Sequence, residues 1–237
     1  MVGPMRVAAL VLAAGRGERL GAGQPKAFLL LAGRPLLVHA VEALAACVRI
    51  EAIVPVLPAA EIARLAGWSW SDAAARKLAP PVAGGAERQD SMRAGLGALP
   101  AGVEFVAVHD AARPLVRPDD VARVVAAAER CGAALLAVPV RDTLKRVRDG
   151  RVVETPAREG LWAAQTPQVF RASLLREAIA KAEAEGFQGT DDAQIVERLG
   201  VPVEIVAGDP SNLKITWPAD LAWAEACVRE RAAGAER

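Results

Sequence analysis

Histidine and cysteine are scarce in this sequence, with two histidines and three cysteines in 237 residues. Cys47, Cys131 and Cys227 are far apart and lack metal-like spacing, so the sequence predicts neither a zinc site nor a disulfide framework. We expect all three to be buried, reduced thiols. A magnesium site is not excluded, because magnesium prefers oxygen ligands.

The sequence also lacks long apolar runs and an excess of charge. Its 29 basic and 28 acidic residues give a formal net charge of +1, so no overall field favours nucleic acid or an anionic membrane. No apolar stretch approaches the roughly 20 residues that a membrane helix needs. Residues 1–6 do not read as the start of a signal peptide. We therefore expect a cytoplasmic protein that binds neither nucleic acid nor membranes.

Two common nucleotide-binding motifs are absent from the first glycine loop. A dinucleotide fingerprint needs a third glycine, where Leu20 stands, and an acid after the second strand, where the sequence has none. A Walker loop needs Gly-Lys followed by Ser or Thr, whereas Gly17 precedes Glu18 and Arg19.

The residues that are present in this loop suit a triphosphate. Residues 6–12 are almost all apolar, as in a parallel strand that is buried on both faces. Gly15 and Gly17 then allow a turn whose N–H groups point at anionic oxygens. The Arg19 guanidinium can bind two phosphate oxygens, and the Lys26 ammonium is a compact point charge. A plain strand-to-helix turn with solvated charges remains the alternative.

Apolar runs alternate with helical patterns along the chain, which predicts one α/β domain over residues 1–237 with a mostly parallel sheet. We expect strands near 6–12, 50–57, 103–109, 133–138 and 202–207. We expect helices near 35–47, 88–98, 118–131, 171–185, 191–199 and 218–232.

Residues 139–166 interrupt this alternation. They read as an alternating hairpin with an Asp149-Gly150 turn, outside the parallel sheet. A two-stranded arm is marginal in water by itself, so it needs a partner surface. A second copy of the chain is the simplest partner, and we predict a homodimer.

A second candidate segment follows the predicted strand at 103–109. Asp110 and Arg113 would lie at the carboxyl edge of the sheet, where open α/β sheets bind ligands. A carboxylate there could hold Mg²⁺ against phosphate oxygens, or it could simply cap the next helix. We interpret His109 as a packed strand residue and not as a base.

Gly84 and Gly85 precede a predicted helix, so the free N–H groups of its first turn could bind a base edge or an anion. Arg88 and Ser91 would add donors. A double glycine before a helix is more often a connector.

Two later segments are weaker signals. Thr190 is interpreted as a helix N-cap, with Asp191 and Asp192 in the first turn. Lys214 lies in a strand-like segment and by itself reads as a solvated cation.

Taken in order, these segments resemble the 2-C-methyl-D-erythritol 4-phosphate cytidylyltransferases, a family of nucleotidyltransferases. The resemblance spans about residues 6–225. Its motifs are Ala-Ala-Gly-x-Gly-x-Arg with Pro-Lys, Gly-Gly-x-x-Arg-x-x-Ser, His-Asp-Ala-Ala-Arg-Pro, Pro-Val-Arg-Asp-Thr-Leu-Lys, Leu-Trp-x-x-Gln-Thr-Pro-Gln, Thr-Asp-Asp and Asn-Leu-Lys-Ile-Thr. Ala86 stands where the family usually has an acid.

The resemblance implies a Rossmann-like three-layer α/β sandwich with a protruding β-hairpin arm that dimerises. It implies cytidylyl transfer from CTP to methylerythritol phosphate, a step of the non-mevalonate isoprenoid pathway, with Mg²⁺ or another divalent cation. No protein base is needed, because the phosphate monoester is already largely a dianion at neutral pH and attacks the α-phosphorus in line.

The resemblance also implies a role for each site residue. The catalytic cations would be Arg19, Lys26 and Lys214, and the metal ligand would be Asp110. CTP would be bound by Ala13, Ala14, Gly15, Gly85, Ser91 and Ala111. The methylerythritol phosphate would be held by Arg113, Thr143, Arg158, Thr166 and Thr190, with Arg158 reaching the site of the neighbouring subunit.

Three alternatives stay open from the sequence. A related cytidylyltransferase could act on another alditol phosphate, such as ribitol 5-phosphate. A glycosyltransferase would need an Asp-x-Asp metal motif where the chain has His109-Asp110-Ala111. A non-catalytic dimer would bind CTP without releasing pyrophosphate.

Overall fold

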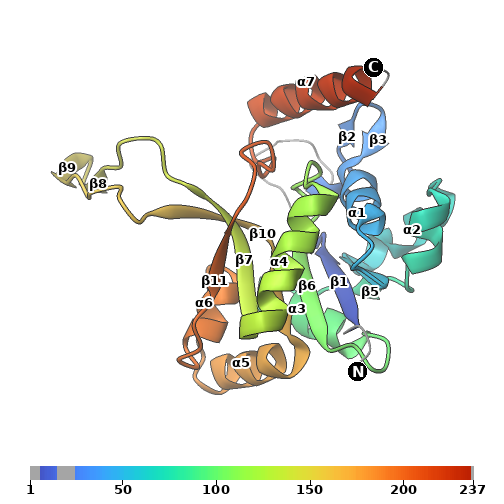
Figure 1. Cartoon of the computed structure of the whole chain (residues 1–237), viewed down its shortest axis with the longest axis horizontal. Helices are drawn as coiled ribbons and strands as arrows, with labels where there is room; N and C mark the ends of the chain where they lie inside the picture. Colours follow the sequence, from blue (N-terminus) through green and yellow to red (C-terminus); the bar gives the residue numbers. More distant parts are fainter. Residues whose placement is uncertain (1–5, 15–24, 236–237) are drawn as a thin grey trace.

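A seven-stranded sheet forms the centre of the computed structural model, which describes residues 6–14 and 25–235 (Figure 1). The strand order is β11-β7-β10-β6-β1-β4-β5. The strands are β1 (Val7–Leu12), β4 (Ala52–Leu57), β5 (Val82–Ala83), β6 (Phe105–Asp110), β7 (Ala133–Pro139), β10 (Trp162–Arg171) and β11 (Glu204–Ala207). Only β10 is antiparallel to its neighbours, so the predicted mostly parallel sheet is confirmed.

Helices cover both faces of this sheet. One core contains α1 (Leu36–Ala46) and α4 (Pro118–Cys131), together with Val7, Ala9 and Val11 of β1. The other core contains Leu10 and Leu12 of the same strand, with α3 (Arg88–Gly97), α5 (Ala172–Ala184) and α6 (Asp192–Glu197). Every residue of β1 is buried, as its continuous apolar run predicts. The result is the predicted three-layer sandwich.

Short elements surround this sandwich. The hairpin of β2 (Leu30–Leu31) and β3 (Arg34–Pro35) packs beside α7 (Pro218–Ala235) over a small apolar cluster. The segment between β4 and β5 holds the 3₁₀ helix η3 (Ala59–Gly67) and α2 (Asp72–Lys77). Across residues 6–14 and 25–235, no helix combines the length and the apolar character that a membrane span requires.

The carboxyl ends of β1 and β6 lie side by side. Leu12 is paired with Asp110 across the two strands, and the Ala111 N–H donates to the Leu12 carbonyl. On the other side, the Ala13 N–H donates to the carbonyl of Val56 in β4. The segment after β1 therefore starts next to Asp110, at the edge where ligands of open α/β sheets bind.

The central strand β10 was not predicted from the sequence. It begins at Trp162, within the segment assigned to the arm, and runs to Arg171 between β6 and β7. Pro167 interrupts the strand pattern, and the register with β7 shifts between Ala164 and Gln168. A proline normally argues against a central strand, which is why this segment did not read as one.

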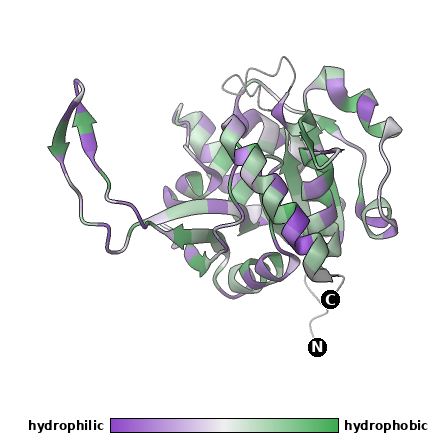
Figure 2. Cartoon of the chain, turned by 90° about the horizontal axis from the view of Figure 1, so that it is seen from above, coloured by the Kyte–Doolittle hydropathy of each residue, from purple (hydrophilic) through white to green (hydrophobic). Residues whose placement is uncertain are grey.

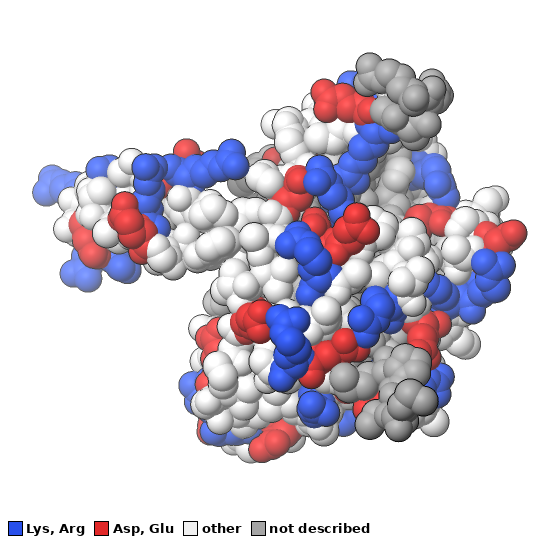
Figure 3. All heavy atoms as spheres, viewed as in Figure 1, with Lys and Arg blue, Asp and Glu red and all other residues white. Residues whose placement is uncertain are grey.

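The arm projects from the body of the protein (Figures 1 and 2). Its tip is the hairpin of β8 (Arg146–Arg148) and β9 (Arg151–Glu154), and all residues of both strands are exposed. Asp149 and Gly150 have φ values of 49° and 73°, as the Asp-Gly turn predicts. Lysine and arginine side chains are prominent along the arm (Figure 3).

The prediction of three buried cysteines is wrong for two of them. Cys47 is buried, Cys131 is exposed and Cys227 is intermediate. Cys131 is the last residue of α4, where the helix leaves the core before Gly132. All three are free thiols, as expected.

Candidate active site

Asp110 is the centre of a charged cluster at the carboxyl edge of the sheet. It ends β6 and is only 6% exposed. Its Oδ1 atom lies 2.6 Å from Nη1 of Arg88, and its Oδ2 atom lies 2.6 Å from Nζ of Lys214. The structure therefore brings Asp110 and Lys214 together, although Lys214 alone did not read as a functional residue.

Arg88 connects Asp110 to a second buried acid. Its Nε and Nη2 atoms lie 3.0 and 2.6 Å from the two carboxylate oxygens of Asp192, which is 1% exposed. This is a bidentate pair, the strong form of an arginine–carboxylate contact. Arg88 thus bridges α3, β6 and α6, a role that the sequence did not reveal.

The Thr190-Asp191-Asp192 segment differs from its interpretation as a threonine-capped helix start. The N-cap of α6 is Asp191, whose carboxylate accepts the N–H of Gln194. Thr190 is exposed and contacts the Gln194 side chain. The Asp192 carboxylate forms an ion pair with Arg88, so its interactions are not limited to the dipole of α6.

Opposing effects set the pKa of Asp110. Burial raises the pKa of this carboxyl, but the charges and hydrogen bonds of Arg88 and Lys214 outweigh burial and hold the pKa well below its usual range. The pKa of Arg88 is raised, because Asp192 and Asp110 outweigh its own desolvation. Asp110 is therefore ionised at neutral pH and can serve as an anionic ligand.

His109 is a packed strand residue, as interpreted from the sequence. It is fully buried, with Nδ1 3.0 Å from the Thr166 hydroxyl oxygen and Nε2 3.1 Å from the Arg113 carbonyl. The same hydroxyl oxygen accepts the Asp110 N–H at 3.0 Å. Burial lowers the pKa of His109 to about 4, so the ring is neutral at pH 7 and helps to hold Thr166 beside Asp110.

His109 gives a testable pH dependence of stability. The unfolded chain binds a proton near pH 6.5, whereas folded His109 does so only near pH 4. The unfolded state therefore binds more protons between these values, and the free energy of unfolding falls as the pH is lowered. We expect protonation at His109 to lower the free energy of unfolding by about 2–3 kcal/mol between pH 7 and pH 4.5.

Urea unfolding across this pH range in metal-free buffer measures the effect, and His109→Gln is expected to lose that part of the slope. His39→Gln is a comparison variant and not a neutral control: burial also lowers the pKa of His39, so this variant should lose the His39 contribution to the slope and keep that of His109. Equal slopes for the unmodified protein and His109→Gln would contradict the prediction.

A hydrogen-bond network fixes the segment that carries Lys214. The Ile215 N–H donates to the Ala112 carbonyl, so this segment lies along the loop after β6. Asn212 is completely buried and donates from Nδ2 to the Thr166 carbonyl at 2.9 Å. The backbone carbonyl of Asn212 accepts a hydrogen bond from Nη1 of Arg113 at 2.8 Å. Asn212, which the sequence did not single out, therefore joins Arg113, Thr166 and the Lys214 segment.

The Gly84-Gly85 turn lies against the segment after β1. A Cβ atom on Gly84 would come within 2.8 Å of the Ala14 Cβ and 2.7 Å of the Ser91 Oγ, so only glycine fits without displacement. The Gly85 N–H donates to the Ser91 Oγ at 3.2 Å. The predicted turn and its helix are confirmed, and the turn lies next to Ala14.

The predicted site residues fall into three groups. Ala13, Ala14, Lys26, Gly85, Ser91, Asp110, Ala111, Arg113, Thr166, Thr190 and Lys214 are described in the body of the protein. Thr143 and Arg158 are on the projecting arm, both exposed, and Arg158 donates to the Arg141 carbonyl of the arm itself. Gly15 and Arg19 lie outside the described residues.

The residues near Asp110 fit a divalent cation that a nucleotide helps to bind. In the described part of the chain, no group of three or more histidine, cysteine, aspartate or glutamate residues could hold a metal ion alone. Mg²⁺ is commonly held by one or two carboxylates and substrate phosphates, which suits a single Asp110. Of its two partners, Lys214 has the more exposed side chain, at 46% against 27% for Arg88.

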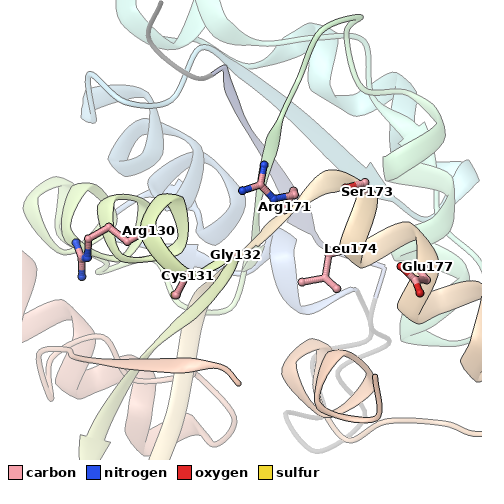
Figure 4. Close-up of a pocket in the computed structure, with 7 residues that line it drawn as sticks. All are labelled: Arg130, Cys131, Gly132, Arg171, Ser173, Leu174 and Glu177. Carbon is pink, nitrogen blue, oxygen red and sulfur yellow. The ribbon is translucent and has the colours of Figure 1, made fainter. Parts of the chain in front are cut away.

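A separate hollow lies at the opposite edge of the sheet (Figure 4). Its lining includes Arg130, Gly132 and Arg171, where α4 ends, β7 begins and β10 ends. Strand β10 runs antiparallel to β6, so the end of β10 lies at the opposite edge of the sheet from Asp110, which ends β6. None of the predicted site residues lines this hollow, so it is not part of the cluster around Asp110.

The comparisons with known proteins agree with one another. The family model described as IspD, 2-C-methyl-D-erythritol 4-phosphate cytidylyltransferase, matches residues 7–230. Curated proteins with that name from Pelotomaculum thermopropionicum and Symbiobacterium thermophilum are 46% and 47% identical to this chain. Each alignment covers 95% of this chain, and 95% and 94% of those proteins.

Solved structures give the same result. The 2-C-methyl-D-erythritol 4-phosphate cytidylyltransferase of Thermus thermophilus is 39% identical, with a TM-score of 0.78 over 95% of this chain and all of that one. The 4-diphosphocytidyl-2C-methyl-D-erythritol synthase of Anaerococcus prevotii is 27% identical, with a TM-score of 0.81 over 95% of this chain and 99% of that chain.

Proposed function

The chain belongs to the 2-C-methyl-D-erythritol 4-phosphate cytidylyltransferase family, and from this we propose how its own residues perform the reaction. It is a nucleotidyltransferase that transfers a cytidylyl group from CTP to 2-C-methyl-D-erythritol 4-phosphate in isoprenoid biosynthesis. The reaction gives 4-diphosphocytidyl-2-C-methyl-D-erythritol and releases pyrophosphate.

One observation carries the assignment of the site: Arg88 and Lys214 converge on the buried carboxylate of Asp110 at the carboxyl edge of the sheet. The attacking phosphate is already largely dianionic, so the protein has no proton to remove. Its task is to align two highly charged reactants and to neutralise the charge that develops during transfer. A cluster of fixed cations and one anionic metal ligand suits this task.

We assign the catalytic charges to Lys26 and Lys214, with Arg19 as a third cation outside the described residues. The nucleotide contacts are Ala13, Ala14, Gly15, Gly85, Ser91 and Ala111. Asp110 would hold Mg²⁺ or another divalent cation together with CTP, and the ion would add positive charge at the phosphates. Support comes from the ionised state of Asp110 and its place at the carboxyl edge.

The acceptor contacts are assigned to two subunits. Arg113, Thr166 and Thr190 would act from the body, while Thr143 and Arg158 would reach the site of a partner copy in a homodimer. The exposed strands of the arm support this, with Val147 and Val152 both more than half exposed. An exposed apolar hairpin needs a partner surface. Cytoplasmic location and the absence of nucleic-acid or membrane partners stay predictions from the sequence.

Subunit mixing tests this assignment. Lys26→Ala changes the body and Arg158→Ala changes the arm, and each variant is expected to be nearly inactive alone. A hybrid dimer of the two has one site with both defects and one site with neither. Random assortment makes half of the dimers hybrids, so a refolded equal mixture should regain about a quarter of the pyrophosphate release of the unmodified protein.

The assay contains CTP, Mg²⁺ and methylerythritol 4-phosphate, and each variant refolded alone is the control. No recovery in a mixture that gel filtration shows to be dimeric would mean that the arm does not serve the partner's site. Release that persists in excess EDTA would count against the divalent cation.

A further inference from the structure

Lys26 stands at the start of a very short helix. The 3₁₀ helix η2 (Lys26–Phe28) has three residues, of which Ala27 and Phe28 are buried. Within this turn the Phe28 N–H donates to the Pro25 carbonyl, and the Leu29 N–H donates to the Lys26 carbonyl. Lys26 and Phe28 are thus two residues apart in one short turn, and the buried Phe28 attaches this turn to the core.

The outer side of Phe28 is covered by a segment distant in the sequence. The ring of Trp68 lies 5.3 Å from the Phe28 ring, centroid to centroid, in a tilted arrangement. The Arg64 guanidinium lies over the same ring at 4.4 Å. Tilted aromatic pairs and cation–π contacts of this geometry are attractive. Trp68 and Arg64 therefore both contact the ring of Phe28, which is 2% exposed.

This covering segment is itself anchored to the body. Ser71, the N-cap of α2, donates from its backbone N–H and from its hydroxyl to the Glu42 carboxylate in α1. Lys77, at the end of α2, donates to the carbonyls of Ala45 and Cys47 at the end of α1. The residues that follow Trp68 are thus hydrogen-bonded to α1 and its C-terminal end at two points, Ser71 and Lys77.

We propose that Trp68 is a positioning residue for Lys26. By closing the packing site of Phe28, Trp68 together with Arg64 sets the orientation of η2 and hence the point at which the Lys26 ammonium meets the phosphates. The inference rests on the catalytic role that we propose for Lys26. A displacement of about 1 Å in a catalytic group costs as much as 10²-fold in rate, so this packing matters for turnover.

A double-mutant cycle tests the proposal. Trp68→Ala should lower kcat by about 10-fold or more while the KM for methylerythritol phosphate stays within about 2-fold, because only Lys26 moves. In a Lys26→Ala background the same substitution should have no further effect on kcat. Trp68→Phe, which keeps an aromatic ring on Phe28, should restore most of the turnover.

Two further variants make the result decisive. Trp223→Ala removes a tryptophan on α7 that is 46% exposed, and it should leave kcat unchanged. Arg64→Met removes the cation–π contact of Arg64 with Phe28. Because Arg64 is exposed, this variant should fold even if Trp68→Ala does not. Loss of the contact should lower kcat by about 2- to 5-fold. That loss should also vanish in the Lys26→Ala background.

The proposal is overturned if Trp68→Ala or Arg64→Met lowers kcat equally with and without Lys26, or if both keep the kcat of the unmodified protein. If Lys26→Ala itself retains full turnover, the catalytic role of Lys26 fails, which is a separate result from the first two.

Discussion

Lys26→Ala is expected to lower kcat by about 10³-fold or more while the Kd for CTP changes by only a few fold. The ammonium would compensate charge that increases as the α-phosphorus is transferred, so its loss acts on the transition state more than on the bound nucleotide. Arginine fingers in other phosphoryl-transfer enzymes contribute about 10³–10⁵ in rate. Steady-state kinetics and calorimetric titration of CTP measure the two quantities.

Lys26→Arg keeps the charge but replaces a compact ammonium with a planar fork, so we expect only partial recovery of kcat. Lys181→Ala, a lysine on the exposed side of α5, is the matched control and should leave both quantities unchanged. A loss of CTP binding as large as the loss of turnover would mean that Lys26 holds the ground state, and would contradict the proposed role.

Arg88→Met is expected to destabilise the fold by about 3–5 kcal/mol. The substitution leaves Asp192 buried without its cation, whereas Asp110 still has Lys214. Breaking a buried pair by removing one partner is costly because the remaining charge is desolvated and uncompensated. Urea unfolding at pH 7 and a fixed protein concentration measures the change.

The paired control is the double variant Arg88→Met with Asp192→Asn. It removes the unpaired buried charge, so we expect it to be more stable than Arg88→Met alone. A cost below about 1 kcal/mol for Arg88→Met, which is typical of exposed ion pairs, would show that Asp192 does not depend on Arg88.

The sequence predicts well those features that a few adjacent residues determine. The apolar run of β1, the Asp149-Gly150 turn of the arm and the double glycine before α3 each depend on local chemistry, and each is confirmed. Asp110 was placed at the carboxyl edge because it directly follows an apolar strand, and the structure has it there.

Features that depend on distant residues were missed. Arg88 and Asp192 are separated by 104 residues, and nothing near either one indicates the other. The contact of Trp68 with Phe28 involves a segment between β4 and β5 for which the sequence predicted neither a helix nor a strand. Strand β10 was not predicted because Pro167 interrupts its strand pattern, yet this strand pairs with both β6 and β7. Tertiary contacts outweighed the local signals in each case.

The central position of β10 has a consequence for synthesis on the ribosome. Strands β6 and β7 leave the ribosome first, yet they are not bonded to each other and both pair with β10. Until residue 171 has been translated, one edge of β6 and one of β7 lack the strand that finally lies between them. Unpaired strand edges invite pairing with other chains. The nascent protein is thus most exposed to misassociation while its arm and β10 are being made.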